Sequence, residues 1–184
     1  MKFVQPIRDP RKLEMIKRNL KDKNERNYIL FQIGINTGLR ISDILPLTVK
    51  DVKGTHISIR ERKTGKEKKV LIRKSLRRDL DRYISGMLDW EYLFQGRKRK
   101  GQMKRQPITR NMAYKIIREA AEEAGLAEIG THSMRKTFGY SFYNEKKDIA
   151  LLMDLFNHTE EKVTLRYIGI LQDTLDDALD DFEL

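Results

Sequence analysis

The chain has 184 residues, 39% of them hydrophobic, which is enough for a single domain with a buried core. It has no cysteine, which excludes disulfides and thiolate metal sites, and no apolar run near the roughly 18 residues that a membrane-spanning helix needs. Residues 173–184 hold six acidic and no basic side chains, so residues 1–172 carry 38 basic against 21 acidic residues, a net charge of +17. A body this basic attracts polyanions, and nucleic acid is the usual partner.

Helix signals fill the N-terminal quarter of the chain. Asp9-Pro10 is typical of an N-cap followed by the first helical residue, and apolar residues recur on one face after it. A second helix is predicted over about residues 24–36, where apolar side chains lie nearly all round and indicate burial. Thr37-Gly38 ends this helix, and Ser42-Asp43 is predicted to cap a short helix over residues 44–47.

A β-hairpin is predicted next. Residues 56–60 and 69–72 alternate between polar and apolar side chains, and residues 63–66 form a glycine-containing turn between them. Ser75 is predicted to cap the helix that follows. Residues 97–105 contain six basic side chains and no acidic ones, which favours an exposed loop in contact with a nucleic-acid backbone over a merely solvated charge run.

The remaining segments are predicted to be helical, so the fold class is mainly α with a small antiparallel β-sheet (α+β). Thr109 caps a helix to about residue 124, and two more helices cover about 132–143 and 148–157. A further helix opens at Thr159. The acidic C-terminal segment then carries apolar residues at helical spacing, namely Leu171, Leu175, Ala178, Leu179 and Phe182.

Two arginines are candidates for binding a reacting phosphate. A planar guanidinium is always charged and binds two phosphate oxygens at once. Arg40 follows Gly38, which lets the backbone turn sharply, and Asp43 is a candidate to orient its guanidinium. His132 and Arg135 are spaced i, i+3, so on a helix they share one face and suit a joint grip on one phosphate.

Tyr167 supplies a nucleophile, and His158 stands nine residues before it. A tyrosine with an ordinary pKa of about 10 attacks poorly unless positive neighbours and a base assist it. Attack by a side chain forms a covalent intermediate that keeps the energy of the broken bond. The histidines, which include His56, lack the spacing of metal ligands, and we expect no metal and no other cofactor.

The chain resembles the catalytic domain of the tyrosine recombinase (phage integrase) family over essentially its whole length. The resemblance rests on the stretches around Arg40, Lys63, Arg135 and Tyr167. Where that family usually has a glycine before the second histidine, this chain has Asn157, which tolerates the left-handed backbone conformation nearly as well. The matching stretches are residues 37–45 (TGLRISDIL), 63–66 (KTGK) and 132–138 (HSMRKTF), and Asn157-His158 with Tyr167 nine residues after the histidine.

The resemblance implies the roles of the phosphate-binding residues and the nucleophile. Tyr167 is then the nucleophile, which forms a 3′-phosphotyrosyl bond and releases a 5′-hydroxyl. Arg40 and Arg135 clamp the scissile phosphate. His158 donates a hydrogen bond to a non-bridging oxygen.

The resemblance also implies two proton carriers. His132 is the acid/base partner of the tyrosine, and Lys63 in the hairpin turn protonates the leaving 5′-oxygen. Lys66 competes with Lys63 because the register of the turn is open; Lys63 is preferred since the family's lysine precedes the turn glycine. The side chains expected to contact DNA are Lys66 and, in the basic loop, Arg97, Lys98, Arg99, Lys100, Lys104 and Arg105.

The sequence therefore predicts the catalytic domain of a site-specific DNA recombinase or integrase, of the kind found in mobile elements, which acts on double-stranded DNA in the cytoplasm. Two alternatives are a type IB-like topoisomerase, which shares the chemistry, and a non-catalytic DNA-binding module, against which the complete catalytic set argues. We expect residues 1–171 to form the catalytic domain, without an N-terminal core-binding domain. Residues 172–184 form a tail helix, which docks on a neighbouring protomer in a DNA-bound tetramer, as in relatives, or folds back on its own domain, or frays.

Overall fold

A computed structural model describes residues 4–98, 101, 103, 105–180 and 182 of the chain. In this described part the fold is mainly helical, with a single two-stranded antiparallel sheet, as predicted. The elements in chain order are α1 (Pro10–Lys23), α2 (Glu25–Thr37), α3 (Ile41–Ile44), α4 (Val49–Val52), β1 (His56–Arg60), β2 (Glu67–Leu71), α5 (Lys74–Tyr83), α6 (Arg110–Glu123), α7 (Thr131–Lys146), α8 (Ile149–Phe156), α9 (Glu161–Ile168) and α10 (Ile170–Asp180).

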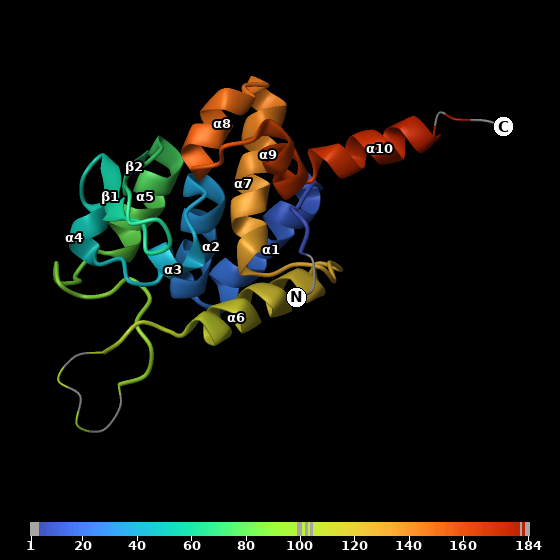
Figure 1. Ribbon diagram of the computed structural model, residues 1–184. Coiled ribbons are helices and arrows are strands. Elements are labelled where there is room, and N and C mark those ends of the chain that lie inside the picture. The colour runs from blue at the N-terminus through green and yellow to red at the C-terminus, as the bar shows by residue number, and fades with distance from the viewer. Residues whose placement is uncertain (1–3, 99–100, 102, 104, 181, 183–184) are drawn as a thin grey trace.

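Helix α2 lies at the centre of the fold and packs against α1, α5 and α7. Figure 1 shows that the hairpin, α4 and α5 lie on one side of α2, and that α7, α8 and α9 lie on the other side of α2. The prediction that apolar side chains around this helix are buried is confirmed. A second, smaller apolar cluster lies under α8 and α9 and contains Leu152, Phe156 and Ile168, all at most 1% exposed. The Phe156 ring of this cluster contacts Arg135, His158 and Tyr167, which are three of the candidates of the C-terminal half.

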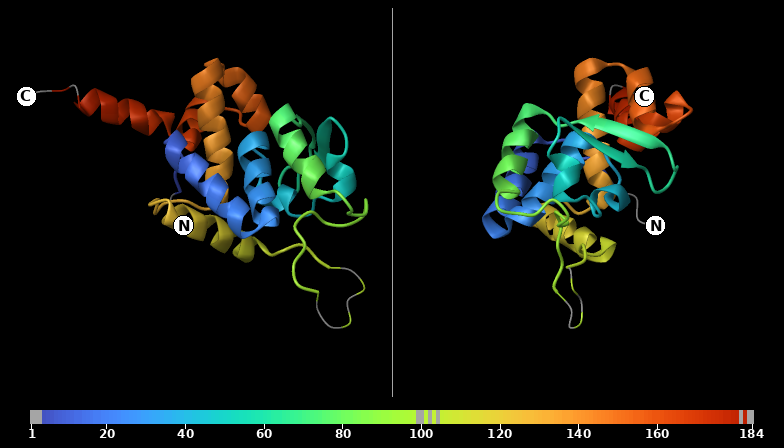
Figure 2. Two further views of the ribbon diagram at one scale, coloured as in Figure 1. Left: turned by 180° about the vertical axis from the view of Figure 1, so that it is seen from behind. Right: turned by 90° about the vertical axis from the view of Figure 1, so that its left-hand side faces the viewer.

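The β-hairpin is confirmed, with a longer second strand than the sequence predicted. His56 pairs with Leu71 and Arg60 with Glu67, so β2 begins at residue 67 instead of 69. The turn closes on Glu61, whose N–H donates to the Lys66 carbonyl at 2.9 Å. Figure 2 shows in its right-hand view that this turn extends outward from the helical body.

The predicted start of the short helix after α2 was wrong. Gly38 has a φ of 63° and ends α2, which is a left-handed conformation that glycine adopts readily. The chain is extended at Arg40, whose carbonyl accepts the Asp43 N–H at 2.8 Å and so begins α3. The Asp43 side chain therefore does not cap a helix over residues 44–47, and its Oδ1 accepts the Arg62 N–H at 3.0 Å.

Other helix starts were predicted with mixed success. Asp9 and Thr109 are N-caps as predicted, and each side chain accepts a backbone N–H of the first turn. Helix α5 begins one residue before Ser75, which is not its cap, and α9 begins after Glu160 instead of at Thr159. At these two ends the chain enters the helix without a side-chain cap, so the local cap signal pointed to the wrong residue.

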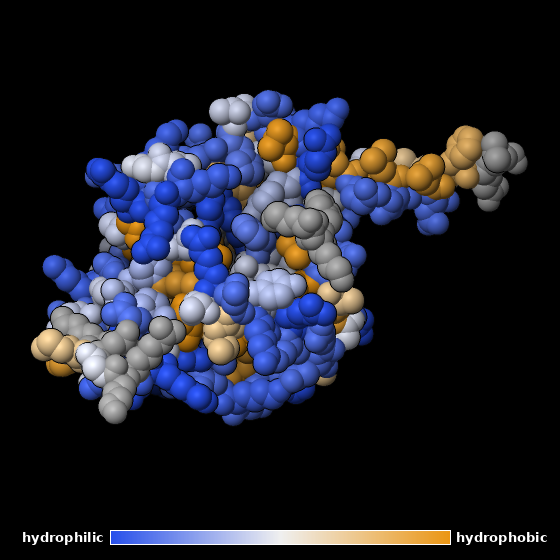
Figure 3. Space-filling model, turned by 60° about the horizontal axis from the view of Figure 1, so that its bottom comes forward, coloured by the Kyte–Doolittle hydropathy of each residue, from blue (hydrophilic) through white to orange (hydrophobic). Residues whose placement is uncertain are grey.

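Helix α10 projects from the body of the molecule (Figures 1 and 2), and none of its described residues is buried. At its base, Asp173 pairs with Arg8 at 2.7 Å. Figure 3 shows apolar side chains along one side of this helix, and Leu175, Leu179 and Phe182 are 58–69% exposed. Helices in the described part of the chain are all too short or too polar to cross a membrane.

Candidate active site

Arg135 anchors the site from α7 and is only 3% exposed. Its Nη1 donates to the Gly38 carbonyl at 2.5 Å and its Nη2 to the Phe156 carbonyl at 3.1 Å. The guanidinium also lies over the Phe156 ring, 4.1 Å from the ring centre. These contacts tie α7 to the C-terminal ends of α2 and α8, which are the points where the segments carrying Arg40 and His158 begin.

Arg40 lies at the start of α3, with its side chain 15% exposed. Its Nη1 lies 2.9 Å from Glu61 Oε1. This contact is an ion pair without the alignment of a hydrogen bond, and in the described part of the chain that nitrogen has no hydrogen-bond partner. The sequence suggested Asp43 as the acid that orients Arg40; the acid in contact is Glu61, because Asp43 is turned toward the Arg62 N–H.

His158 follows Asn157, whose φ of 52° confirms the left-handed conformation expected there. The His158 Nδ1 lies 3.0 Å from Thr164 Oγ1, and the Thr164 hydroxyl donates to the Glu160 carbonyl at 3.1 Å. The single hydroxyl proton of Thr164 can serve only one of these two contacts, so when it goes to the Glu160 carbonyl, Nδ1 is the donor and Nε2 of the neutral ring carries no proton. Burial and then the charge of Arg135 lower the pKa of His158 to about 4.

Tyr167 lies on α9 among aromatic rings. Its ring meets those of Phe156 and His158 edge to face, with centres 5.7 and 5.5 Å away. The ammonium of Lys136 lies 5.3 Å from the Tyr167 ring centre. Burial raises the pKa of the Tyr167 hydroxyl, while the charges of Arg135 and Arg40 act in the opposite direction. The fold therefore brings the tyrosine under the influence of both arginines, although 126 residues separate Arg40 from Tyr167 in the sequence.

The remaining sequence-predicted residues lie around this group. His132 is the second residue of α7, and burial followed by the charge of Arg135 lowers its pKa. Lys63 is exposed in the β1–β2 turn, and its charge contributes to the lowered pKa of His132 and of His158. Lys66 is exposed in the same turn.

Sequence reasoning missed two buried side chains of the site, Glu61 and Lys68. The Glu61 carboxylate is 0% exposed and lies 3.4 Å from the Lys68 ammonium, which is 9% exposed. Lys68 also donates to the Leu155 carbonyl on α8. No signal in the sequence separates Glu61 from Glu67 of the same hairpin, whose side chain is 86% exposed.

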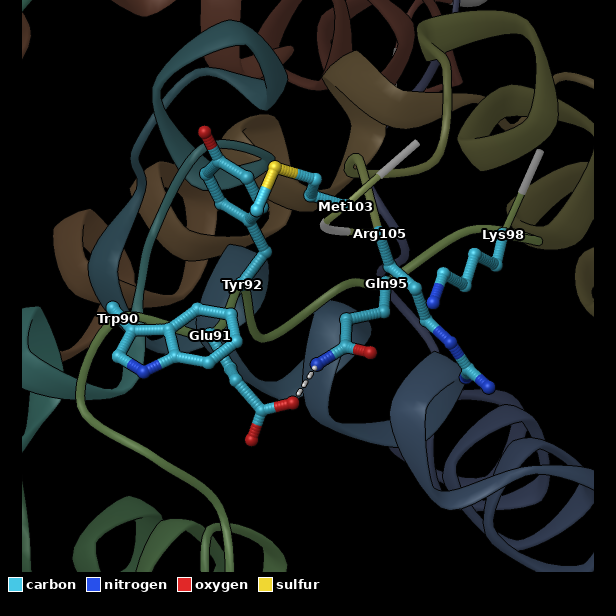
Figure 4. Close-up of a pocket in the computed structure, with 7 residues that line it drawn as sticks. All are labelled: Trp90, Glu91, Tyr92, Gln95, Lys98, Met103 and Arg105. Atoms are coloured by element: carbon cyan, nitrogen blue, oxygen red, sulfur yellow. Dashed lines mark hydrogen bonds between the residues drawn. The ribbon is translucent and has the colours of Figure 1, made fainter. Parts of the chain in front are cut away.

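The described basic residues of the 97–105 segment line cavities that contain none of these site residues. Lys98 and Arg105 line a cavity of about 380 Å³ together with Trp90, Tyr92 and other side chains shown in Figure 4. Arg97 lines a neighbouring cavity. Three further predicted residues lie outside the described part of the chain, namely Arg99, Lys100 and Lys104. Among the described residues, no group of three His, Cys, Asp or Glu side chains is placed to hold a metal ion.

A helical domain that gathers two arginines, two histidines and a tyrosine in this order has the architecture of a tyrosine recombinase catalytic domain. The family model described as "Phage integrase family" matches residues 9–173. The chain therefore belongs to the phage integrase family, whose members are enzymes that cut and rejoin DNA.

Relatives and solved structures agree with this assignment. The chain is 51% identical over 175 residues to the probable integrase/recombinase YoeC of Bacillus subtilis, covering 95% of this chain and 94% of that protein. It is 24% identical to the tyrosine recombinase XerA of Pyrococcus horikoshii, but spans only 59% of that protein. The fold resembles crystal structures of XerA recombinase (TM-score 0.72, 18% identity, 95% of this chain and 64% of that one) and of lambda integrase (TM-score 0.68, 12% identity, 91% and 49%).

Proposed function

We propose that this chain is the catalytic domain of a site-specific recombinase that cleaves double-stranded DNA with Tyr167 and rejoins the strands. The observation that carries the proposal is the convergence of Arg40, Arg135 and His158 on the tyrosine from separate parts of the chain. These groups are the donors that stabilise a phosphate whose charge increases in the transition state. The family membership supports the same reaction.

In the proposed reaction the Tyr167 oxygen attacks the phosphorus, and the bond from phosphorus to the 5′-oxygen breaks. His132 accepts the phenolic proton, which suits an imidazole whose lowered pKa keeps it neutral near pH 7. Lys63 donates a proton to the leaving 5′-oxygen. The charge of Lys63 acts on both His132 and His158, which supports this role over Lys66. Rejoining reverses these steps.

His158 is proposed to donate from Nε2 to a non-bridging phosphate oxygen. With Nδ1 as the donor to Thr164, this requires a proton on both ring nitrogens. The low pKa of about 4 belongs to the protein without DNA. A bound phosphate adds negative charge beside the ring and raises this pKa, so the proposal includes uptake of a proton when the scissile phosphate binds.

We propose that the basic loop and the hairpin turn contact the DNA backbone outside the cleavage site. The described candidates are Lys66, Arg97, Lys98 and Arg105, and the cavity at the base of the loop adds the exposed ring of Trp90 (Figure 4). Arg99, Lys100 and Lys104 belong to the same proposal from the sequence alone. Such contacts act through charge, so each phosphate neutralised lowers the slope of log affinity against log salt by about 0.9.

We further propose that residues 172–184 link protomers in a homotetramer on DNA. We propose that the protein acts in the cytoplasm. The exposed apolar side of α10 and its acidic charge suit a basic neighbouring copy. The lambda integrase structure is a tetramer bound to a Holliday junction, which supports this assembly. Residues 1–171 then form the catalytic unit.

A nicked suicide substrate tests the proposed reaction. The wild-type chain should form a covalent adduct with the DNA, and Tyr167→Phe should form none while binding with unchanged affinity. Absence of an adduct in the wild type on every DNA tried would leave a DNA-binding module. Relaxation of plasmids without any specific site would indicate a topoisomerase instead.

A further inference from the structure

Glu61 is a buried carboxylate, and each of its two oxygens has two polar partners. Its Oε1 lies 2.9 Å from Arg40 Nη1 and 3.4 Å from Lys68 Nζ. Its Oε2 accepts from Thr64 Oγ1 and from Asn157 Nδ2, each at 2.8 Å. A side chain that is 0% exposed and contacts four polar groups is held in one orientation.

These partners come from three segments that carry the proposed catalytic residues. Arg40 begins α3, and Thr64 stands next to Lys63 in the hairpin turn. Asn157 ends α8 directly before His158. The backbone of Glu61 also closes the turn, since its carbonyl accepts the Gly65 N–H at 2.8 Å. One carboxylate therefore joins the phosphate-binding arginine, the lysine turn and the histidine loop.

Charge explains why an acid is needed at this point. Burial and then the positive charges of Arg135 and Arg40 lower the pKa of Lys68, whereas the negative charge of Glu61 raises it. Burial by itself raises the pKa of Glu61, but the Thr64 hydroxyl, Lys68 and Arg40 together hold it below the usual value. Glu61 is therefore ionised at neutral pH and offsets the repulsion among these cations.

We propose that Glu61 is a positioning residue for DNA cleavage, which holds the Arg40 guanidinium at the phosphate site by anchoring it to the hairpin turn and to Asn157 before the His158 loop. This inference rests on the proposed function. Glu61 touches no reacting atom in the proposal. It acts on the cleavage step through the alignment of Arg40, and contributes little to the strength of noncovalent DNA binding.

Two matched variants test this inference. Glu61→Gln removes the charge and keeps the size of the side chain, and Glu67→Gln makes the same change at an exposed site of the same hairpin. The rate of covalent adduct formation is measured in a single turnover on the nicked substrate. Noncovalent affinity is measured with each substitution in the Tyr167→Phe background, and thermal unfolding is followed for all proteins.

Glu61→Gln should slow adduct formation at least about tenfold, because misplacing a transition-state donor by a fraction of an ångström is costly. Its DNA affinity should stay within about twofold of that of Glu67→Gln, since the two variants have the same net charge. In the Arg40→Lys background the effect of Glu61→Gln should fall below about twofold, because the guanidinium on which Glu61 acts is absent. Equal cleavage by Glu61→Gln and Glu67→Gln, or effects that multiply independently of Arg40, would overturn the inference.

A charge-balanced variant covers the case in which Glu61→Gln is too unstable to assay. Glu61→Gln combined with Lys68→Gln removes one buried anion and one buried cation together, which restores the charge balance of the interior. This double variant should unfold near the wild-type temperature and still cleave slowly. If the double variant unfolds at the wild-type temperature and also cleaves at the wild-type rate, Glu61 is only structural. A Tyr167-dependent adduct in the wild type keeps the proposed function intact in either case.

Discussion

Gly139 is expected to control how closely the helix of Tyr167 packs on α7. A Cβ added at this residue would lie 2.7 Å from Ile168 Cγ2 and 2.8 Å from Phe156 Cε2. Both neighbours are at most 1% exposed, so neither has open space to move into. Phe156 also carries the Arg135 guanidinium on its face and meets the Tyr167 ring. Gly139→Ala should therefore disturb the packing of the proposed site directly.

The size of the effect follows from two opposing terms. Alanine in place of glycine inside a helix favours folding by about 1 kcal/mol. Overpacking a tight interior costs about 1–3 kcal/mol, and the upper part of this range, about 2–3 kcal/mol, applies here because two side chains must shift. A net loss of about 1–2 kcal/mol lowers the unfolding temperature of a chain this long by about 2–8 °C. Displacement of Tyr167 and Arg135 by a few tenths of an ångström should slow adduct formation by about tenfold.

Thermal unfolding and single-turnover cleavage measure the two effects separately. Gly54→Ala is the control, because a Cβ there would meet nothing nearer than the His56 carbonyl oxygen at 3.8 Å. The control should unfold and cleave like the wild type. A Gly139→Ala protein with an unchanged or higher unfolding temperature and full cleavage would refute the close packing of α7 on Phe156 and Ile168.

Three further predictions concern the His158 loop and the tail. Asn157→Ala should lose about 1 kcal/mol of stability at a φ of 52°, measured by urea unfolding, whereas Asn157→Gly should keep the backbone conformation and lose only the hydrogen bond to Glu61. Folding lowers the pKa of His158 from 6.5 to about 4, so the unfolded state takes up the proton first. The contribution of His158 to the free energy of unfolding should be fully present above pH 6.5 and should decrease as the pH falls from 6.5 toward 4. His158→Gln should flatten this pH dependence. Deleting residues 172–184 should leave the unfolding temperature nearly unchanged, because among the described residues of this segment it removes no buried side chain and breaks the partly exposed ion pair of Asp173 with Arg8. The deletion should abolish cooperative assembly on DNA seen by gel shift.

Much of the fold was predictable because its signals are local. The cap at Asp9, the cap at Thr109 and the left-handed ends at Gly38 and Asn157 depend on the conformational preferences of single residues and their immediate neighbours. The buried character of α2 was equally plain from its apolar circumference. Where a helix starts without a side-chain cap, as at Arg73 and Glu160, the same local signals pointed to the wrong residue.

The chemical candidates were predictable for a different reason. A guanidinium, an imidazole and a phenol have properties that belong to the residue type, but the chain has many arginines and seven tyrosines. Arg40, Arg135, His158 and Tyr167 stood out because their order and spacing resemble those of one family. Their convergence is a matter of tertiary structure, since it depends on α2, α7, α8 and α9 packing side by side.

The sequence by itself determined the elements, the positive charge of the body and the set of reactive groups. Only the tertiary structure decided that Glu61 is the acid paired with Arg40, while Glu67 of the same hairpin stays in solvent. The physical reason is that burial and ion pairing arise from segments distant in the sequence, here the α3 start, the hairpin turn and the end of α8. The preference of a residue for helix, strand or turn contains no information about which distant charge will lie beside it.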